Sequence, residues 1–168
     1  MSDTITLRLA TPADLAAVDA LLARAYPRLL AADYPPSVLV TAVPLIARAR
    51  PELLASGRYW LACASTGAVL AAAGWSSRSP ADGTGDSRTA HIRHVVTDDR
   101  ATRRGLARAV LIRAMDQAQT EGFTRFDCLS TLTARPFYQS LGFVAQGPID
   151  ILLAPGIAFP AIRMLRET

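Results

Sequence analysis

The fold is decided by one stretch of the chain, Val95-Val96-Thr97-Asp98-Asp99-Arg100-Ala101-Thr102-Arg103-Arg104-Gly105-Leu106-Ala107-Arg108. The apolar run from His91 to Thr97 predicts a strand, and the spacing of apolar residues from Arg104 to about Glu121 predicts a long helix. A strand that enters a helix through a glycine-containing turn directs backbone N–H groups and the positive end of the helix dipole at one point. The arginines crowded at this helix start oppose the dipole unless an anion binds there. The stretch therefore predicts an anion site, with a solvated arginine face as the alternative.

This turn differs from two common phosphate-binding motifs. A nucleotide P-loop needs a Gly-Lys-Ser/Thr sequence, and the chain contains no lysine at all. The three-glycine fingerprint of dinucleotide-binding turns is also missing from this stretch. The absence of lysine further excludes a lysine nucleophile or a Schiff base.

Outward from this stretch, the chain alternates strands and helices. Apolar and alternating runs predict strands at 4–9, 59–64, 69–75, 126–129, 144–153 and 162–165. Thr11-Pro12 predicts a helix start. A second helical region is predicted to begin at Pro35-Pro36, with interruptions at Pro44 and Pro51. A short helix is predicted over 134–141. Residues 77–87, rich in Ser, Gly, Pro and Asp, predict an exposed loop.

These elements predict an α+β fold of three layers (α/β/α) over a single domain, residues 1–168. We expect a mixed, mostly antiparallel, twisted sheet of six to seven strands flanked by helices. The fourth and fifth strands should run parallel and splay apart, because a long helix connects them as a crossover.

Composition limits the class of protein further. Hydrophobic residues make up 51% of the chain, which excludes disorder, and no apolar run approaches the ~20 residues of a membrane span. The N-terminal sequence has no signal-peptide character, so we expect a cytoplasmic protein that does not bind membranes. Cys63 and Cys128 lie in apolar runs without metal-ligand spacing, so neither a metal site nor a disulfide is predicted. The net charge of +4 suits an anionic partner.

Two motifs resemble those of the GNAT superfamily of N-acetyltransferases. The family's acetyl-CoA motif is a strand, then Gln or Arg, two residues, Gly, one residue, and Gly or Ala. Gly105 and Ala107 match it, whereas Thr102 stands where Gln or Arg is usual. The second motif is a strand and a short helix ending Phe-Tyr-x-x-x-Gly-Phe, which residues 137–143 match, with Thr131 where the family often has Asn. Both motifs occur in the family's order and separation.

The resemblance implies a GNAT-like fold and an enzyme that transfers an acetyl group from acetyl-CoA to a primary amine by direct attack. The sequence does not identify the acceptor. The resemblance is compatible with a homodimer and implies no metal. The pyrophosphate of coenzyme A would bind the N–H groups of residues 103–108, and the pantetheine arm would pair with residues 95–97 like an added strand. The implied cofactor-binding residues are Val95, Val96, Thr97, Thr102, Arg103, Arg104, Gly105, Leu106, Ala107, Arg108, Thr131, Phe137 and Tyr138.

Two catalytic roles follow from the resemblance and the chemistry. Tyr138 is the expected general acid, which would protonate the departing thiolate; packing beside Phe137 is its alternative role. The amine must lose a proton before it attacks, so a base or an ordered water is needed. The base stays open among His94, Asp98, Glu52 and Tyr34.

Two other classes of function compete with this hypothesis. The departures at Thr102 and Thr131 leave room for a module of the same fold that binds acyl-CoA without turnover, as a sensor or interaction domain. A nucleic-acid-binding protein is permitted by the pI of about 9.7. The basic residues gather at one helix start, without the aromatic residues that stack on bases, so no nucleic-acid partner is expected.

Overall fold

The computed structural model describes residues 4–168. All its strands form one sheet with the order β1-β2-β3-β4-β5-β7-β6. The strands are β1 (Thr6–Leu9), β2 (Tyr59–Cys63), β3 (Val69–Ser76), β4 (Thr89–Thr97), β5 (Arg125–Ser130), β6 (Val144–Ala154) and β7 (Ile157–Glu167). The sequence predictions of an α+β fold and a sheet of six to seven strands are confirmed.

One strand pair separates the sheet into two parts. β4 and β5 run parallel, whereas every other neighbouring pair is antiparallel. Pairing between β4 and β5 covers only residues 89–91 of β4, opposite 125–127 of β5. Beyond His91 the two strands splay apart, as the crossover helix predicts. The splay leaves one edge of β4 from Ile92 to Thr97 without a neighbouring strand.

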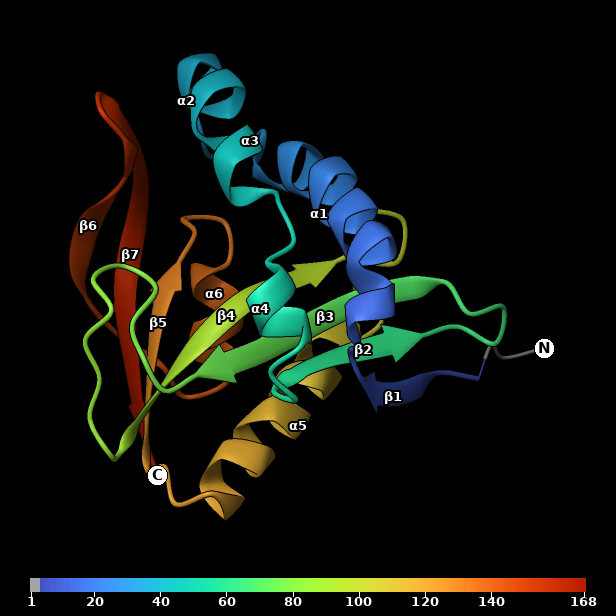
Figure 1. Cartoon of the computed structure of the whole chain (residues 1–168). Coiled ribbons are helices and arrows are strands. Elements are labelled where there is room, and N and C mark those ends of the chain that lie inside the picture. Colours follow the sequence, from blue (N-terminus) through green and yellow to red (C-terminus); the bar gives the residue numbers. More distant parts are fainter. Residues whose placement is uncertain (1–3) are drawn as a thin grey trace.

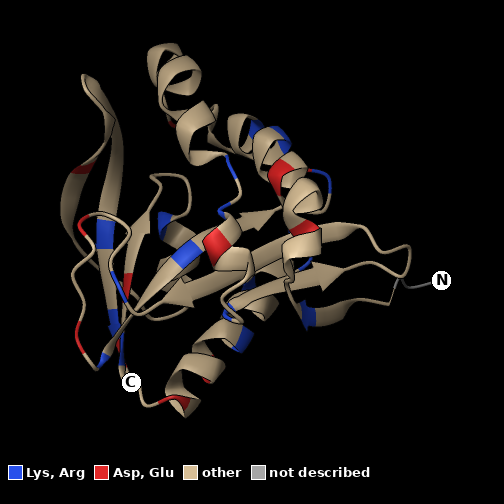
Figure 2. Ribbon diagram, in the orientation of Figure 1, with Lys and Arg blue, Asp and Glu red and all other residues tan. Residues whose placement is uncertain are grey.

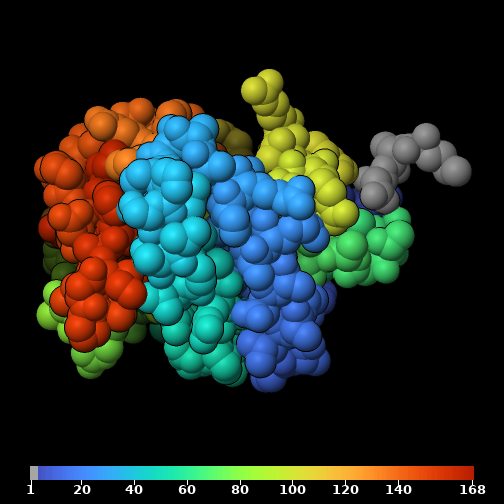
Figure 3. Space-filling view, turned by 90° about the horizontal axis from the view of Figure 1, so that it is seen from above, coloured from blue at the N-terminus to red at the C-terminus, as the bar shows by residue number. Residues whose placement is uncertain are grey.

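Helices cover both faces of the sheet, which gives the three predicted layers (Figure 1). One face carries the 3₁₀ turn η1 (Pro12–Asp14), α1 (Leu15–Leu30), α2 (Pro36–Thr41), α3 (Val43–Ile46) and α4 (Pro51–Leu54). The other face carries α5 (Leu106–Thr120) and α6 (Arg135–Ser140). Each face has its own buried apolar cluster. Seen from above, α2 and α3 lie between α1 and the β6–β7 hairpin (Figure 3).

Local chemistry explains where the first helices begin. The Thr11 N–H donates to Asp14 Oδ2 at 2.8 Å, which satisfies one backbone donor at the first helix start. Prolines stand in the first turns of α2, α3 and α4, where a missing N–H costs no helical hydrogen bond. These prolines also keep the second helical region in three short pieces.

Several predicted boundaries differ from the structure, and two of the differences have a clear local cause. α5 begins at Leu106 instead of Arg104, because Gly105 adopts a left-handed conformation (φ 71°) and is the N-cap. β7 extends over Ile157–Glu167, well beyond the predicted 162–165. Pro160 conceals this length in the sequence, since proline usually argues against an inner strand. Here β5 pairs with β7 only from Ile162 onward, so Pro160 lies beyond the end of that ladder.

Candidate active site

A cleft of about 1130 Å³ opens where β4 and β5 separate. Because β4 lies between the two helical layers, residues from both faces of the sheet line this cleft. Many of the residues singled out from the sequence lie along it: His94, Val95, Val96, Thr97, Thr102, Arg103, Ala107, Thr131, Phe137 and Tyr138. The structure thus brings the two motifs together, although they are about 30 residues apart in the chain.

The other predicted cofactor-binding residues are not part of the cleft lining. Arg104, Gly105 and Arg108 are exposed at the start of α5, whereas the Leu106 side chain is buried in the core beneath that helix. Gly105 and Leu106 can therefore offer only backbone groups to a ligand. The guanidinium groups of Arg104 and Arg108 are free to reach an anion at this helix start.

A β-bulge shapes the β4 wall of the cleft. Ala72 lies opposite Val96 and Gly74 lies opposite Arg93, so β4 has two residues where β3 has one. His94, within this bulge, has a positive φ of 46°. Tyrosines from other elements hold its carbonyls: the Tyr59 hydroxyl donates to His94 O at 2.7 Å, and the Tyr26 hydroxyl donates to Val95 O at 3.2 Å.

The bulge also changes which face each side chain occupies. Strict alternation would place Ile92 and Val95 on opposite faces of the sheet. Both instead pack with the apolar cluster on the α5 side, while Val96 packs with the cluster under α1. The backbone of residues 94–96 is therefore presented to the cleft in an irregular conformation next to the unpaired edge.

The turn between β4 and α5 is built to receive an anion. Arg103 (φ 63°) and Gly105 (φ 71°) both adopt left-handed backbone conformations, a feature of turns whose N–H groups form anion-binding concavities. No side chain caps the N–H groups at the start of α5. Asp98 anchors the turn, since its carboxylate accepts hydrogen bonds from the Arg100 N–H at 2.8 Å and from the Arg24 guanidinium.

Tyr138 is buried at the opposite wall of the cleft. Its ring packs edge-on against Phe137 and Phe143, with centroid distances of 5.2 and 5.4 Å. Burial raises the pKa of the Tyr138 phenol well above its usual value, so the hydroxyl keeps its proton. The Cys128 thiol interacts with this hydroxyl, and burial raises the pKa of that thiol to about 12. The site therefore strongly disfavours a bare thiolate.

The candidate bases separate into two groups. Asp98 is held by Arg100 and Arg24, and those partners lower its pKa to about 2 despite its burial. The Tyr34 hydroxyl donates to Pro160 O at 2.7 Å and accepts from the Leu132 N–H at 2.8 Å. Neither Asp98 nor Tyr34 lines the cleft, whereas His94 and Glu52 do.

His94 differs from an ordinary histidine. Burial, followed by the nearby charges of Arg93 and Arg50, lowers its pKa to about 4. Its imidazole is therefore neutral at physiological pH and has a free base form. By contrast, His91 is buried outside the cleft lining, and its Nε2 has no hydrogen-bond partner among residues 4–168.

Sequence reasoning did not single out Arg50, Arg93 or Tyr26, which also line the cleft. The charge of Glu52 in α4 acts on the guanidinium of Arg93 in β4, so the two residues are near each other. Figure 2 shows an acidic segment next to a basic one where α4 covers β4. The two positions are about 40 residues apart, and only the packing of α4 over β4 brings them together. No local pattern could have revealed them.

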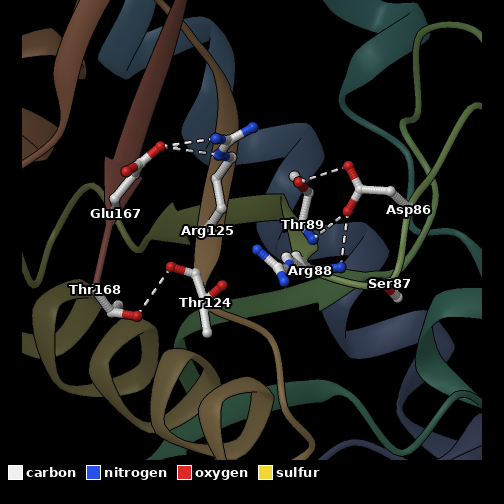
Figure 4. Close-up of a pocket in the computed structure, with 8 residues that line it drawn as sticks. All are labelled: Asp86, Ser87, Arg88, Thr89, Thr124, Arg125, Glu167 and Thr168. Carbon is white, nitrogen blue, oxygen red and sulfur yellow. Dashed lines mark hydrogen bonds and ion pairs between the residues drawn. The ribbon is translucent and has the colours of Figure 1, made fainter.

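A second, smaller pocket of about 360 Å³ lies at the other end of β4 and β5 (Figure 4). Several of its polar groups are partnered within the pocket. Arg125 pairs with Glu167 at 2.8 Å, and Asp86 accepts hydrogen bonds from the N–H groups of Arg88 and Thr89. It holds none of the residues predicted to be functional, so we place the candidate site in the larger cleft.

Residues 4–168 contain neither a metal-binding cluster nor a membrane-spanning helix. No cluster of three or more His, Cys, Asp or Glu side chains there could hold a metal ion. No helix in that range is both long enough and apolar enough to cross a bilayer.

Comparison with known proteins identifies the family. Residues 22–143 match the family described as "Acetyltransferase (GNAT) family", while no curated protein matches the sequence. The fold is similar to that of a GCN5-related N-acetyltransferase from Rhodopseudomonas palustris, with a TM-score of 0.75 at 16% identity over 100% of this chain and 99% of that chain.

Two further solved structures of this fold contain the co-substrate. PaiA N-acetyltransferase from Thermoplasma acidophilum, in complex with coenzyme A, has a TM-score of 0.72 at 11% identity over 98% of this chain and 99% of that chain. YncA from Salmonella typhimurium, a candidate acetyltransferase with its cofactor acetyl-CoA, has a TM-score of 0.66 at 20% identity over 98% and 94%. Since the family match covers well over half of its length and the fold agrees throughout, this chain belongs to the GNAT family of acetyltransferases.

Proposed function

We propose that this protein transfers an acetyl group from acetyl-CoA to a primary amine by direct attack, with Tyr138 as the general acid. The observation that carries the proposal is the cleft between β4 and β5, where an unpaired strand edge, a turn suited to anions and a buried tyrosine meet. Each of these three features matches one part of the chemistry.

The cleft fits acetyl-CoA as a substrate. The free edge of residues 95–97 offers backbone hydrogen bonds to an extended pantetheine arm. A Cβ built on Gly105 meets no protein atom within 4 Å, so the space over this turn is open to a pyrophosphate. The uncapped N–H groups of α5 and the exposed Arg104 and Arg108 supply positive potential there.

The residues of this chain would move two protons during the transfer. As the amine nitrogen forms its bond to the acetyl carbon and the C–S bond breaks, the amine proton must leave and the thiolate must gain one. His94 is the proposed base, since its neutral imidazole lines the cleft beside the bulge; Glu52 is the second candidate. An N–H near Val96 would stabilise the oxyanion.

Desolvation acts on both partners of the proton transfer from Tyr138. In bulk water a phenol with a pKa of about 10 would transfer its proton uphill to a thiolate of about 8.5. In this cleft, burial raises the pKa of the neighbouring Cys128 thiol to about 12. A departing thiolate at this place meets the same desolvation, which raises its affinity for the proton and offsets the rise in the pKa of the Tyr138 phenol.

The direct test is release of free thiol from acetyl-CoA across a panel of amines. The proposal predicts turnover with at least one amine and an N-acetyl product by mass spectrometry. Tight coenzyme A binding without thiol release across the panel would instead support the acyl-CoA-binding module. The single-domain organisation of residues 1–168, the cytoplasmic location and a homodimer stay predictions.

A further inference from the structure

Three arginines line the cleft, and two of them, Arg50 and Arg93, lie away from the β4–α5 turn that holds Arg103. Neither Arg50 nor Arg93 forms an ion pair with a carboxylate in the described part of the chain. The one hydrogen bond found for the Arg93 side chain runs from Nη1 to Ser76 Oγ at 3.2 Å. Burial lowers the pKa of Arg93, which indicates that its charge is desolvated. A partly buried, unpaired guanidinium is costly unless an anion binds it.

These arginines lie on the other side of the sheet from the proposed coenzyme A site. The coenzyme A site is built from the β4–α5 turn and α6, whereas Arg50 and Glu52 belong to the start of α4 on the opposite face. Arg93 precedes the bulge that lies between the two sites. The amine acceptor would therefore enter from the α1–α4 face and meet Arg50 and Arg93 on its way to the thioester.

The charges in this part of the cleft match a zwitterion. Two arginines against the one carboxylate of Glu52 leave one net positive charge (2 − 1 = 1), because His94 is neutral near pH 7. The Glu52 charge acts on Arg93, but the two form no ion pair within 4.0 Å, so an ammonium group can still approach this carboxylate. The planar guanidinium of Arg93 suits a carboxylate, which it can bind in a bidentate manner.

The remaining walls on this side are apolar. They include Leu29, Ile46, Ile151 and Phe159, from α1, α3, β6 and β7. A polyamine, which carries several positive charges, would meet two further cations, and an amino sugar would leave this apolar surface unused. A compact amine with a carboxylate and an apolar body uses every feature of the cleft.

We infer that the acceptor is an amino acid or similar amine that carries a carboxylate, bound by Arg93 with Arg50, and an apolar side chain. This inference rests on the proposed function, since it names the substrate class of the same site. Glu52 would attract the ammonium group, which must lose one proton to solvent before attack, and His94 would take the second proton as the free amine attacks the thioester.

Matched acceptors test the inference on the unmodified protein. Leucine, leucinamide and 3-methylbutylamine share one apolar body, but leucine alone has the carboxylate; phenylalanine and its amide and amine form a second set. The amino group of an amide is less basic than that of the amino acid, so more of it is unprotonated at a given pH. A higher kcat/KM for the amino acid than for its amide therefore cannot result from amine ionisation. We expect kcat/KM at least tenfold higher for the amino acids than for both neutral partners.

Variants then assign the preference to a residue. Arg93→Gln should raise the KM for the amino acid at least tenfold, bring the three acceptors to within about threefold, and leave the calorimetric Kd for coenzyme A unchanged. Arg48→Gln is the matched control, an exposed arginine outside the cleft, and should keep the preference. If Arg93→Gln does not fold, the same comparison of acceptors is made with Arg50→Gln, which should also weaken the preference for the amino acid.

The possible failures are distinguishable. If no amine releases thiol, the proposed function fails. If amines turn over but the neutral partners are equal or better, only the carboxylate inference fails. A loss of coenzyme A affinity in folded Arg93→Gln would assign this arginine to the co-substrate and would also overturn the inference.

Discussion

Replacing Tyr138 with phenylalanine separates a catalytic tyrosine from a packing one. The substitution removes a single hydroxyl and leaves the ring between Phe137 and Phe143, at 5.2 and 5.4 Å. The interaction found for that hydroxyl is with the Cys128 thiol. Removing it exposes no backbone group and opens no large cavity.

The expected effects on stability and on rate differ in size. A neutral hydrogen bond contributes about 1 kcal/mol net, and a thiol is a weak partner, so unfolding should be affected by less than that. For a domain of this size, about 1 kcal/mol corresponds to a change in Tm of about 2–4 °C. Loss of a positioned general acid should lower kcat by about 10²–10⁴, which corresponds to about 3–5 kcal/mol in the transition state.

The measurement is kcat from thiol release, beside Tm by circular dichroism and coenzyme A affinity by calorimetry. Tyr34→Phe is the matched control. Its hydroxyl bonds Pro160 O and the Leu132 N–H outside the cleft, so its removal costs two hydrogen bonds to part-buried backbone groups. Each such hydrogen bond contributes about 0.5–1.5 kcal/mol net. Tyr34→Phe should therefore lower Tm more than Tyr138→Phe does, yet keep kcat within about threefold.

The opposite pattern would refute this reasoning. A folded Tyr138→Phe protein with parental kcat would make Tyr138 a packing residue and would leave the thiolate to be protonated by water. The kcat loss should also shrink for acyl donors with a more acidic leaving thiol, and an equal loss for all donors would contradict the role of acid.

Three further predictions test other parts of the site. Because the folded pKa of His94 is about 4 and its unfolded pKa about 6.5, unfolding takes up a proton between these values, so stability should fall as pH drops from about 6.5 to about 4. His94→Asn, which tolerates the positive φ, should make that fall smaller in urea titrations and leave the part due to His91, whose pKa burial also lowers. Gly105→Val should raise the Kd for coenzyme A more than tenfold by filling the space over the turn, whereas Gly57→Val, at φ 72° and equally unobstructed, should cost similar stability and leave that Kd unchanged. Arg104→Gln should weaken coenzyme A binding severalfold in low salt and show a smaller effect in high salt, measured by calorimetry at two ionic strengths.

Sequence reasoning located most of the cleft because its signals are local. The spacing of apolar residues in α5, the glycine before it and the Phe137-Tyr138 pair can each be read within a few turns of chain. The crossover helix then dictates that β4 and β5 are parallel. The order of the elements follows from such patterns without any knowledge of distant contacts.

What the sequence could not predict depends on distant packing. The bulge at His94 appears only in the pairing of β4 with β3. Strict alternation along the sequence therefore predicts the wrong face of the sheet for side chains beyond the bulge. The neighbourhood of Arg50, Glu52 and Arg93 exists only because α4 packs over β4. Asp98 is buried and pairs with Arg24 of α1, which lies more than 70 residues away in the chain. The sequence around Asp98 therefore could not show that this candidate base is held in an ion pair.

The three paired residues that join β4 to β5 have a thermodynamic consequence. At that position the two parts of the sheet are joined only by the pairing of residues 89–91 with residues 125–127. An extended ligand lying along the free edge of β4 would supply the hydrogen bonds that β5 does not make there. Ligand binding and the association of the two parts of the sheet would then be thermodynamically linked. Stabilisation by RT ln(1 + [L]/Kd) would then be concentrated in amide exchange along this seam, with little change at the outer strands β1 and β6.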